Sequence, residues 1–362
     1  HYPGPTTIKS YLDTTSLPLL PHIIFNHRVT SLRHTLPTDG GAQLRWIMEA
    51  TPTLSDGEAF VEQFDFVVVG NGHYTLPYVP LIEGLKSWEG GISHSRWYRT
   101  PEPYRDETVL VIGNSASGYD ITRQIAISLF ERKSSSPELA NALPKIYQVQ
   151  KGPYALGVPF DAPDAPEWAR SIGIFPPVQR IEGKTIFFED GRTLDDVDHI
   201  IFATGYLYSF PFADHTQAPF SSHPLTVSPF PSCSPASPSG GLRVHNLDRR
   251  QLFYLPDPTL SFICLPLGVI PFPLGEAQSR LVAAFYADRL PKPLVFEVGV
   301  DEEGVESHSA HFWGGEREYD EQDGLLKDAG DGGEGGKWGR AERATRDLRV
   351  GCVGLRKSLL SY

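Results

Sequence analysis

The alternation of apolar and polar residues along the chain predicts buried strands that follow antiparallel pairs. Residues 64–73 read FDFVVVGNGH and residues 197–206 read VDHIIFATGY, so each segment is an apolar run that follows Asp and ends in Gly. This repeat predicts two related halves, although apolar strands that end in Gly occur in any α/β protein. Each copy follows a predicted antiparallel pair: residues 44–48 with 59–61, and residues 178–181 with 185–188.

A strand, a glycine turn and a helix are predicted upstream of the second copy. Residues 108–112 (TVLVI) form an apolar run, GNSASG follows at 113–118, and Ile121, Ile125 and Leu129 then recur at helical spacing. This order fits a dinucleotide-binding turn in which Ser115 replaces the middle glycine. Gly113 would permit the tight turn and Gly118 the close packing of the helix, whose N-terminus would face a pyrophosphate.

The next predicted strand, residues 145–150, is followed by Lys151 rather than by an acid. An acid at this place would bind a ribose 2′-hydroxyl, whereas a cation can pair with a 2′-phosphate. Lys151 therefore favours NADPH over NADH. The alternative is a solvated lysine at the end of a strand.

Composition and charge exclude several classes of protein. The chain has 362 residues, enough for about two domains. Its net charge is −12, and residues 301–345 carry 13 acidic against 5 basic side chains, so the remainder is close to neutral. A near-neutral body with an acidic tail lacks the basic surface that nucleic acid requires. We expect residues 313–362, which include six glycines between 330 and 339, to be a disordered acidic tail.

Three cysteines, at positions 233, 264 and 352, are too far apart for a disulfide framework or a zinc ribbon, and we expect no metal site. A reducing, cytoplasmic location is the simplest expectation. The longest apolar stretch, residues 260–274, contains three prolines and predicts no membrane span. The chain begins at His1 rather than Met, so we expect further sequence upstream, in which a targeting signal could lie.

One motif between the two halves makes a family resemblance specific. Residues 88–98 read WEGGISHSRWY, and WxGxxxHxxxY resembles the FxGxxxHxxxY motif of flavin-containing monooxygenases, with Trp88 in place of Phe. Tyr98 and Arg99 resemble the fungal-like, N- and S-oxygenating branch (N,N-dimethylaniline monooxygenase-like), whereas Baeyer-Villiger monooxygenases carry Trp followed by Pro or Asp. Because Trp97 lies one position away, a Baeyer-Villiger type stays an alternative. Further runs resemble the same family between about Tyr11 and Pro293: residues 71–80, 98–101, 203–212, 257–260, 271–272, 276–278 and 290–291.

The resemblance implies an α/β fold with two dinucleotide-binding, Rossmann-like domains. The NADPH domain, residues 98–204, would be inserted in a discontinuous FAD domain formed by residues 1–97 and 205–312. Residues 219–240 hold six prolines and seven serines, which predicts a flexible surface insertion in the second FAD part.

The family also implies a reaction and its cofactors. Reduced FAD, supplied with electrons by NADPH, captures O2 as a C4a-hydroperoxide and passes one oxygen atom to a small nucleophile with a soft nitrogen or sulfur. The hard chemistry then belongs to the cofactor, and the protein supplies binding, orientation and exclusion of water. No catalytic triad is therefore expected, and His94 is expected to be structural.

Residue roles follow from the same resemblance. Asn71 is the candidate catalytic residue and would lie with Gly72 beside the flavin, and Thr204 occupies the matching place in the second copy. The remaining candidates have structural alternatives: Val29 in strand core, Gln278 exposed on a helix, and the two serines as plain helix caps. Val29, at the end of a predicted strand 23–29, would serve the flavin adenine; Gln278 the isoalloxazine; and Asn114, Ser115 and Ser117 the NADP pyrophosphate and ribose.

Three functions stay open at this stage. The leading one is the FAD- and NADPH-dependent monooxygenase. In the second half, Gly113 of the glycine turn precedes Gly205 at the strand exit. The same spacing counted back from Gly72 places the flavin glycine loop before His1. Gly40 and Gly41 do not replace this loop, because no predicted helix begins there. We therefore expect this chain to bind FAD weakly or not at all, which also allows a truncated, inactive NADP-binding fragment. A disulfide reductase of related architecture would need a redox Cys pair, which the sequence lacks.

Overall fold

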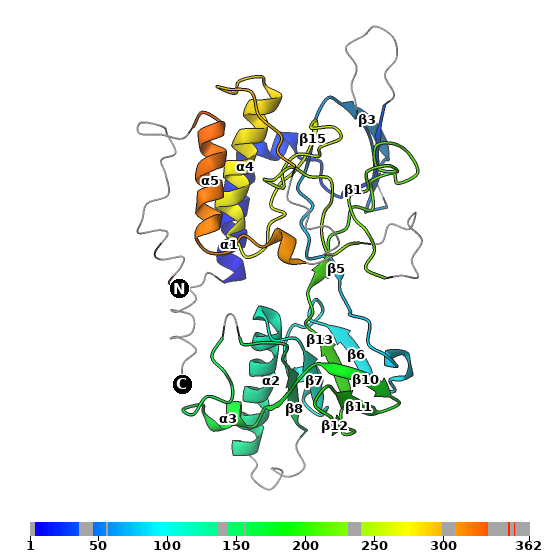
Figure 1. Ribbon diagram of the computed structural model, residues 1–362, viewed down its shortest axis with the longest axis vertical. Coiled ribbons are helices and arrows are strands. Elements are labelled where there is room, and N and C mark those ends of the chain that lie inside the picture. The colour runs from blue at the N-terminus through cyan, green and yellow to red at the C-terminus, as the bar shows by residue number, and fades with distance from the viewer. Residues whose placement is uncertain are drawn as a thin grey trace. The chain divides into compact units, whose positions relative to one another are not determined.

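The computed structural model describes residues 4–35, 46–55, 57–135, 144–154, 157–230, 240–298, 308–331, 347 and 351 (Figure 1). The chain divides into two compact units, of which the first comprises residues 1–67 and 210–224 and the second residues 68–209 and 225–362. Each unit is described by itself. This division does not test the predicted flavin and NADPH parts, so their boundaries stay a prediction.

The first unit begins with two helical segments and continues as an antiparallel sheet. Helix α1 spans Pro5–Ser16 and the 3-10 helix η1 spans Leu17–His22. Strands β1 (His27–His34), β2 (Trp46–Pro52) and β3 (Phe60–Phe64) pair in that order, which confirms the first predicted antiparallel pair with shifted bounds. Trp46 and Leu32 are almost completely buried in this unit.

The predicted strand 23–29 is wrong in its bounds. Two prolines, Pro18 and Pro21, favour a short 3-10 helix, and β1 starts only at His27 and continues to His34. Val29 therefore lies inside β1, opposite Ala50, and is 37% exposed, so neither a strand end nor strand core describes it. Large apolar side chains of α1, η1 and the residues that follow η1 are also exposed: Ile8, Tyr11, Leu12, Leu17, Leu19, Leu20, Ile23, Ile24 and Phe25.

A fully parallel five-stranded sheet forms one part of the second unit. Its strands are β6 (Gly91–His94), β7 (Val109–Ile112), β8 (Ile146–Val149), β9 (Gly173–Phe175) and β13 (His199–Phe202). They lie in the order β6-β13-β7-β8-β9, and every neighbouring pair is parallel. Strand β6 belongs to this sheet although the sequence assigned residues 91–94 to the flavin part, because β6 pairs with β13 along its whole length.

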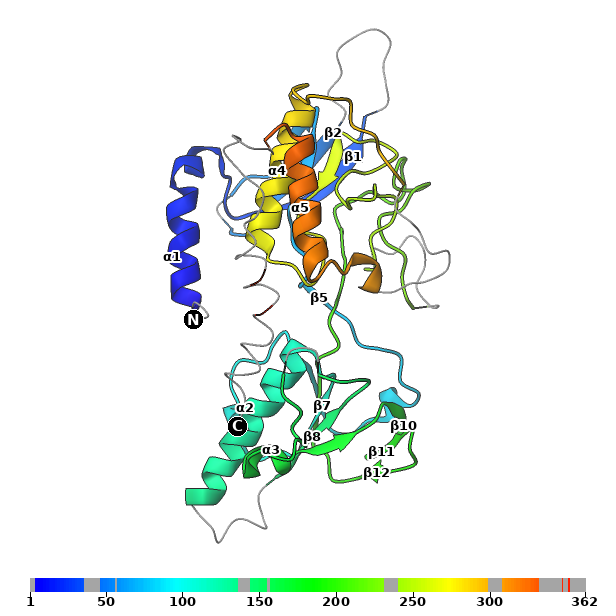
Figure 2. The same ribbon diagram turned by 60° about the vertical axis from the view of Figure 1, so that its left-hand side comes forward.

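Both faces of the parallel sheet are covered, because successive side chains of its strands point to opposite faces. On one face Val109, Val111 and Ile201 pack with residues of α2 (Ala116–Ser135) and α3 (Glu167–Arg170). On the other face Leu110 and Phe202 pack against a small antiparallel sheet, and both Figure 1 and Figure 2 show it opposite α2. This sheet consists of β10 (Val178–Glu182), β11 (Thr185–Phe188) and β12 (Thr193–Leu194) and confirms the second predicted antiparallel pair.

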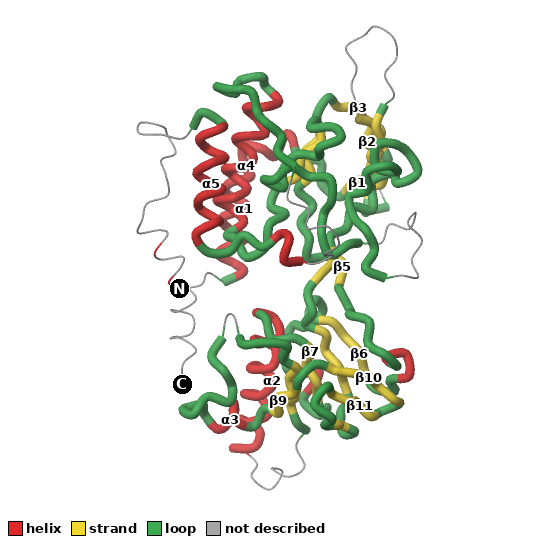
Figure 3. Tube along the Cα trace, in the orientation of Figure 1, coloured by secondary structure: helices red, strands yellow, loops and turns green. Residues whose placement is uncertain are grey.

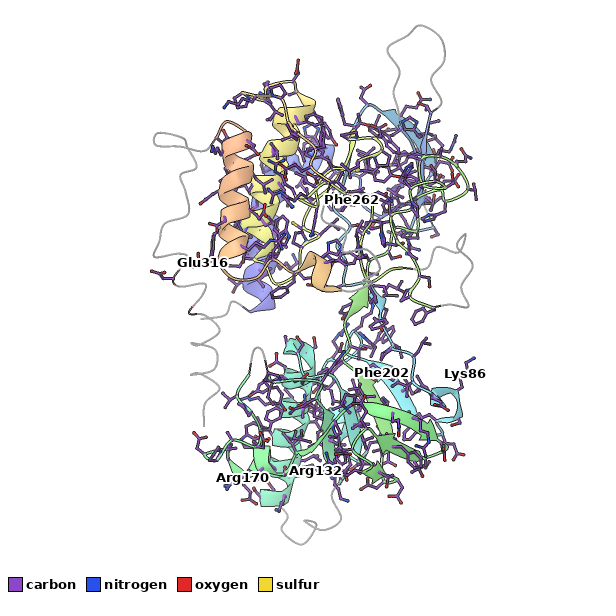
Figure 4. The ribbon with its side chains drawn as sticks, viewed as in Figure 1. Lys86, Arg132, Arg170, Phe202, Phe262 and Glu316 are labelled. Atoms are coloured by element: carbon purple, nitrogen blue, oxygen red, sulfur yellow. The ribbon has the colours of Figure 1, made fainter. Side chains whose placement is uncertain are left out.

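The repeated apolar segment forms a strand in both copies, but the surroundings differ. The second copy, β13, lies between β6 and β7, and Phe202, labelled in Figure 4, is fully buried there. The first copy, β4 (Val67–Val69), pairs with β15 (Leu260–Phe262), and its Val68 is 46% exposed. Sequence similarity therefore identified the strands but not their neighbours. Each copy is followed by one strand of a short pair, β5 (Leu76–Pro77) and β14 (Tyr206–Leu207).

Helix α5 (Glu316–Asp328), which packs beside α4 (Pro271–Tyr286), corrects part of the expectation of a disordered tail at residues 313–362. Figure 3 shows the two helices side by side. Trp313 is fully buried, and α5 buries a stripe at helical spacing that its acidic composition hides: Glu318, Tyr319, Gln322 and Leu325. Residues 332–346, 348–350 and 352–362 of the predicted tail lie outside the described residues.

The predicted flexible insertion is also partly wrong. Phe220 and Leu225 are almost completely buried, because this proline-rich segment supplies apolar side chains to the interior. Residues 231–239 lie outside the described part. Short 3-10 helices complete the fold: η2 (Leu85–Ser87), η3 (Glu102–Tyr104) and η5 (His308–His311). Within the described ranges, no helix combines the length and apolar character that crossing a membrane would need.

Candidate dinucleotide site

The predicted glycine turn joins β7 to α2, and both of its glycines are required by the backbone. Gly113 has φ +117°, and a Cβ built on it would overlap the carbonyl oxygen of Ala203. A Cβ on Gly118 would overlap the Gly113 carbonyl oxygen and lie 2.7 Å from its carbonyl carbon. The turn and the first helical turn thus touch backbone to backbone, as a dinucleotide-binding turn requires.

The N-terminus of α2 is open at its first turn. The Ser115 carbonyl accepts a hydrogen bond from the Tyr119 N–H at 2.9 Å, and α2 begins at Ala116. Ser115 and Ser117 are exposed, and within the described ranges neither hydroxyl takes part in a hydrogen bond. Both hydroxyls and the partial positive charge of the helix end can therefore meet an anion.

The loop that follows β8 is tied to the glycine turn. Asn114 Nδ2 donates to the Gly152 carbonyl at 2.5 Å, so one side of the Asn114 amide is already used. Lys151, next to Gly152, is exposed, and we find no ion pair to it among the residues that the structure describes. The structure therefore brings the predicted pyrophosphate turn and the predicted 2′-phosphate lysine to the same edge of the sheet.

A buried polar network under the turn was missed by the sequence analysis. Gln148, in the middle of β8, is fully buried; its Nε2 donates to the Gly113 carbonyl at 3.3 Å. Its Oε1 accepts from the Tyr154 hydroxyl at 2.5 Å, and Gln150 Nε2 donates to the same hydroxyl. The signal that could have found it is a glutamine in an otherwise apolar buried strand, where an amide needs partners.

A second group of predicted residues lies where β4 and β13 end. Asn71 is exposed and its Nδ2 donates to the Ser209 carbonyl at 3.2 Å; Gly72 follows with φ +70°. The Thr204 hydroxyl donates to the Tyr78 carbonyl, and the Tyr78 N–H donates to the Gly205 carbonyl at 2.9 Å. Thr204 thus joins the two crossing segments, and a contact of its hydroxyl with a cofactor would compete with this bond.

Gln278 is fully buried on α4, so the alternative of an exposed helix residue is wrong. Its Oε1 accepts from the Cys264 N–H at 2.8 Å, and within the described residues its Nε2 makes no hydrogen bond. Cys264 adopts φ +59°, and burial raises the pKa of its thiol. Its neighbour Ile263 donates its N–H to the Val69 carbonyl at 3.0 Å, which places this segment beside the end of β4.

Val29 belongs to the first unit and the other predicted residues to the second. The structure therefore groups Gly113, Asn114, Ser115, Ser117, Gly118 and Lys151 at one place, and Asn71, Gly72 and Gln278 near the end of β4. Val29 lies in the antiparallel sheet of the first unit.

His94 and Tyr98 of the sequence motif have structural partners. His94, at the end of β6, is 2% exposed, and its Nδ1 accepts the Arg96 N–H at 3.1 Å. Burial lowers the pKa of His94, which favours the neutral ring. Tyr98 stacks on Tyr104 and donates to Gln124 Oε1 at 3.2 Å. Neither side chain has the arrangement of a general acid or base.

The chain matches a family model described as flavin-binding monooxygenase-like over residues 6–132 and 168–226, about half of its length. The chain belongs to this family. The match includes the glycine turn, the first helical turn of α2 and the motif at residues 88–98. It confirms the family resemblance that the sequence predicted.

Relatives of this flavin-binding monooxygenase-like chain are monooxygenases from yeast, plants and a mushroom. A thiol-specific monooxygenase of Saccharomyces cerevisiae is 31% identical over 237 residues, which are 65% of this chain and 48% of the relative. Flavin-containing monooxygenase FMO GS-OX-like 7 of Arabidopsis thaliana is 36% identical over 66% of this chain and 43% of its own length. Flavin-containing monooxygenase iboF of Amanita muscaria is 29% identical over 76% and 52%. The chain spans about half the length of these relatives.

Solved structures agree on the fold. The structure of S-allyl-L-cysteine S-oxygenase from Allium sativum matches 99% of this chain and 72% of its own, with a TM-score of 0.70 and 24% identity. Tmm from a Pelagibacter species matches 87% and 61%, with a TM-score of 0.57 and 20% identity. These likenesses confirm the predicted α/β class with Rossmann-type domains.

Proposed function

We propose that this protein binds NADPH at the turn between β7 and α2 and takes part in an FAD-dependent monooxygenation of small nucleophiles. The observation that carries the proposal is the backbone contact between Gly113 and Gly118 in a chain of the flavin-binding monooxygenase-like family. A Cβ at either glycine would fill the space in which the turn closes. The turn therefore fits a bound pyrophosphate, which must approach the backbone.

The residues of the turn would divide the work of binding NADPH. The first-turn amides of α2, with the Ser115 and Ser117 hydroxyls, would bind the pyrophosphate. Lys151, exposed beside Gly152, would pair with the 2′-phosphate. Neither contact involves a reacting atom, so these residues supply affinity and specificity.

The end of β4 fits a flavin in one respect. The Gln278 Nε2 is a buried donor that lacks a hydrogen bond among the described residues, and a flavin carbonyl would satisfy it. By the family resemblance Asn71 and Gly72 would lie at the reacting end of the flavin, and Asn71 is the residue we propose to touch the reaction. Bound flavin would activate O2, and the side-chain amide of Asn71 would orient the reacting groups.

The substrate class follows from the relatives' names. Two of them act on sulfur, as a thiol-specific monooxygenase and an S-oxygenase. We therefore propose a soft sulfur or nitrogen nucleophile. The reaction would consume NADPH, a proton, O2 and a sulfide, and would release NADP+, water and a sulfoxide.

The test of this function has two arms. The 362-residue chain is titrated with NADPH by calorimetry, and then supplied with FAD, NADPH, a thioether and isotopically labelled O2. We expect binding in the first arm and, with FAD in large excess to fill a weak site, one labelled oxygen atom in the sulfoxide in the second. Binding without oxygen transfer would favour a non-catalytic NADP-binding protein. No NADPH binding would contradict the proposal.

Replacing Lys151 by Glu is expected to reverse the nucleotide preference. A charged hydrogen bond to the 2′-phosphate at an exposed position is worth about 1.5 kcal/mol, or about tenfold in affinity for NADPH. The NADH affinity should stay unchanged or rise. Calorimetric titration of both nucleotides checks this; equal dissociation constants for NADPH and NADH in the unmutated chain would exclude a role for Lys151.

A further inference from the structure

Gln148 is a buried polar side chain in the middle of a parallel sheet. It is fully buried on β8, between β7 and β9. Its neighbours Tyr147 and Val149 pack on the opposite face of the sheet, so Gln148 lies on the face that α2 covers. Burial of an amide without hydrogen-bond partners costs free energy, so the hydrogen-bond partners of Gln148 indicate its role.

Both ends of the Gln148 amide are used. Its Nε2 donates to the carbonyl of Gly113 at 3.3 Å, and its Oε1 accepts from the Tyr154 hydroxyl at 2.5 Å. Tyr154 is itself buried and packs edge-on against Tyr119 of α2, with ring centroids 5.3 Å apart. The amide therefore cannot rotate without losing both hydrogen bonds.

The Gly113 carbonyl is the important partner because of the geometry of the peptide bond. A trans peptide is planar, so the carbonyl of Gly113 and the N–H of Asn114 point in opposite directions. Gln148 holds the carbonyl toward the interior of the sheet, where Gly118 also touches it. The Asn114 N–H then points away from the interior, and within the described residues no hydrogen bond involves it.

We infer that Gln148 is a positioning residue for the nucleotide: it fixes the Gly113–Asn114 peptide so that the Asn114 N–H faces the phosphate. The inference rests on the proposed NADPH-binding function. Gln148 does not touch the nucleotide. The same amide accepts the hydroxyl of Tyr154 and so also fixes the loop that carries Lys151. The hydrogen bond from Asn114 to the Gly152 carbonyl ties this loop to the glycine turn a second time.

The first experiment measures NADP+ binding to the 362-residue chain by calorimetry, well below the melting temperature. Gln148→Met keeps the shape of the side chain but removes both hydrogen bonds, and Gln148→Glu keeps an acceptor for Tyr154 but loses the donor to Gly113. Both variants are expected to raise the dissociation constant about tenfold, the loss of one charge-assisted amide contact. Tyr154→Phe, which spares the donor, should raise it less.

The matched control is Ile186→Val, a buried side chain of β11, which packs against the opposite face of the parallel sheet. It is expected to lower the melting temperature and leave the NADP+ dissociation constant unchanged. If Gln148→Met and Ile186→Val behaved alike, Gln148 would act only on stability, and the inference would fail.

The second measurement needs no nucleotide. Hydrogen exchange of the two bonded amides next to the turn, the Gly113 N–H on the Val149 carbonyl and the Tyr119 N–H on the Ser115 carbonyl, is expected in the free chain to be faster in Gln148→Met than in the unmutated chain or in Ile186→Val. Unchanged exchange would overturn the positioning role whatever the affinities are. Faster exchange in a chain that does not bind NADP+ would support the positioning of the turn and contradict the proposed function, so the two failures are distinguishable.

Discussion

Gly118→Ala is expected to abolish measurable NADP+ binding and to destabilise the second unit. The added Cβ would overlap the Gly113 carbonyl oxygen and lie 2.7 Å from its carbonyl carbon, and both are backbone atoms that cannot rotate away. Overpacking of this kind costs about 3 kcal/mol. If α2 moves to relieve the overlap, its first-turn amides leave the pyrophosphate, and the loss of two such bonds lowers affinity about 100-fold or more.

Thermal unfolding and calorimetric titration of the same sample check this result. Gly324→Ala is the matched control, because Gly324 also lies inside a helix but has open space around its Cβ. Alanine there should stabilise the helix slightly, by about 1 kcal/mol. Normal NADP+ affinity in Gly118→Ala would place the nucleotide elsewhere.

The glycine turn could be predicted because its constraints are local. A positive φ, a backbone contact and a helix start within six residues leave only certain side chains allowed, and the sequence GNSASG shows them directly. The two antiparallel pairs and the strands of the repeat were likewise recognisable from period and turn residues. The stripe Ile121, Ile125 and Leu129 marked α2, and Ile121 and Ile125 are almost completely buried.

The parts that could not be predicted depend on partners distant in sequence. Gln148 looks like any polar residue at a strand, and only the fold brings Gly113 and Tyr154 to its two ends. Strand β6 joined the parallel sheet through pairing with β13, more than a hundred residues later. Nothing in the local pattern of either segment announces its partner.

Helix α5 shows the same limit for charge. Its composition is acidic and contains a glycine, which predicted disorder. Two acidic side chains of α5 and one just after it are instead paired with arginines from before or within α4: Asp328 with Arg250, Glu321 with Arg249, and Asp331 with Arg280. A fourth acidic side chain, Glu318, is fully buried. The acidic residues that suggested charge repulsion and disorder therefore help to hold the helix in place.

Glu318→Ala is expected to release α5 from α4 and to lower stability by about 3 kcal/mol. The Glu318 Oε1 accepts the N–H of Ile270, the N-cap residue of α4, at 2.6 Å, where the helix dipole favours a negative charge. Pro271 and Pro273 in the first turn of α4 have no N–H, so few other backbone donors of this helix end are available to the carboxylate. Without the carboxylate, this part-buried N–H loses its partner.

Release of α5 should reach the candidate flavin residues, because the helix that Glu318 caps carries Gln278, which holds the Cys264 N–H. We therefore expect a lower melting temperature together with faster hydrogen exchange and proteolysis across both α4 and α5. Glu318→Gln keeps an acceptor oxygen and should lose about 1 kcal/mol. Glu316→Ala is the control, since Glu316, labelled in Figure 4, is exposed in the same first turn. Equal effects of Glu316→Ala and Glu318→Ala would show that the helix end needs only negative charge and not the hydrogen bond to Ile270.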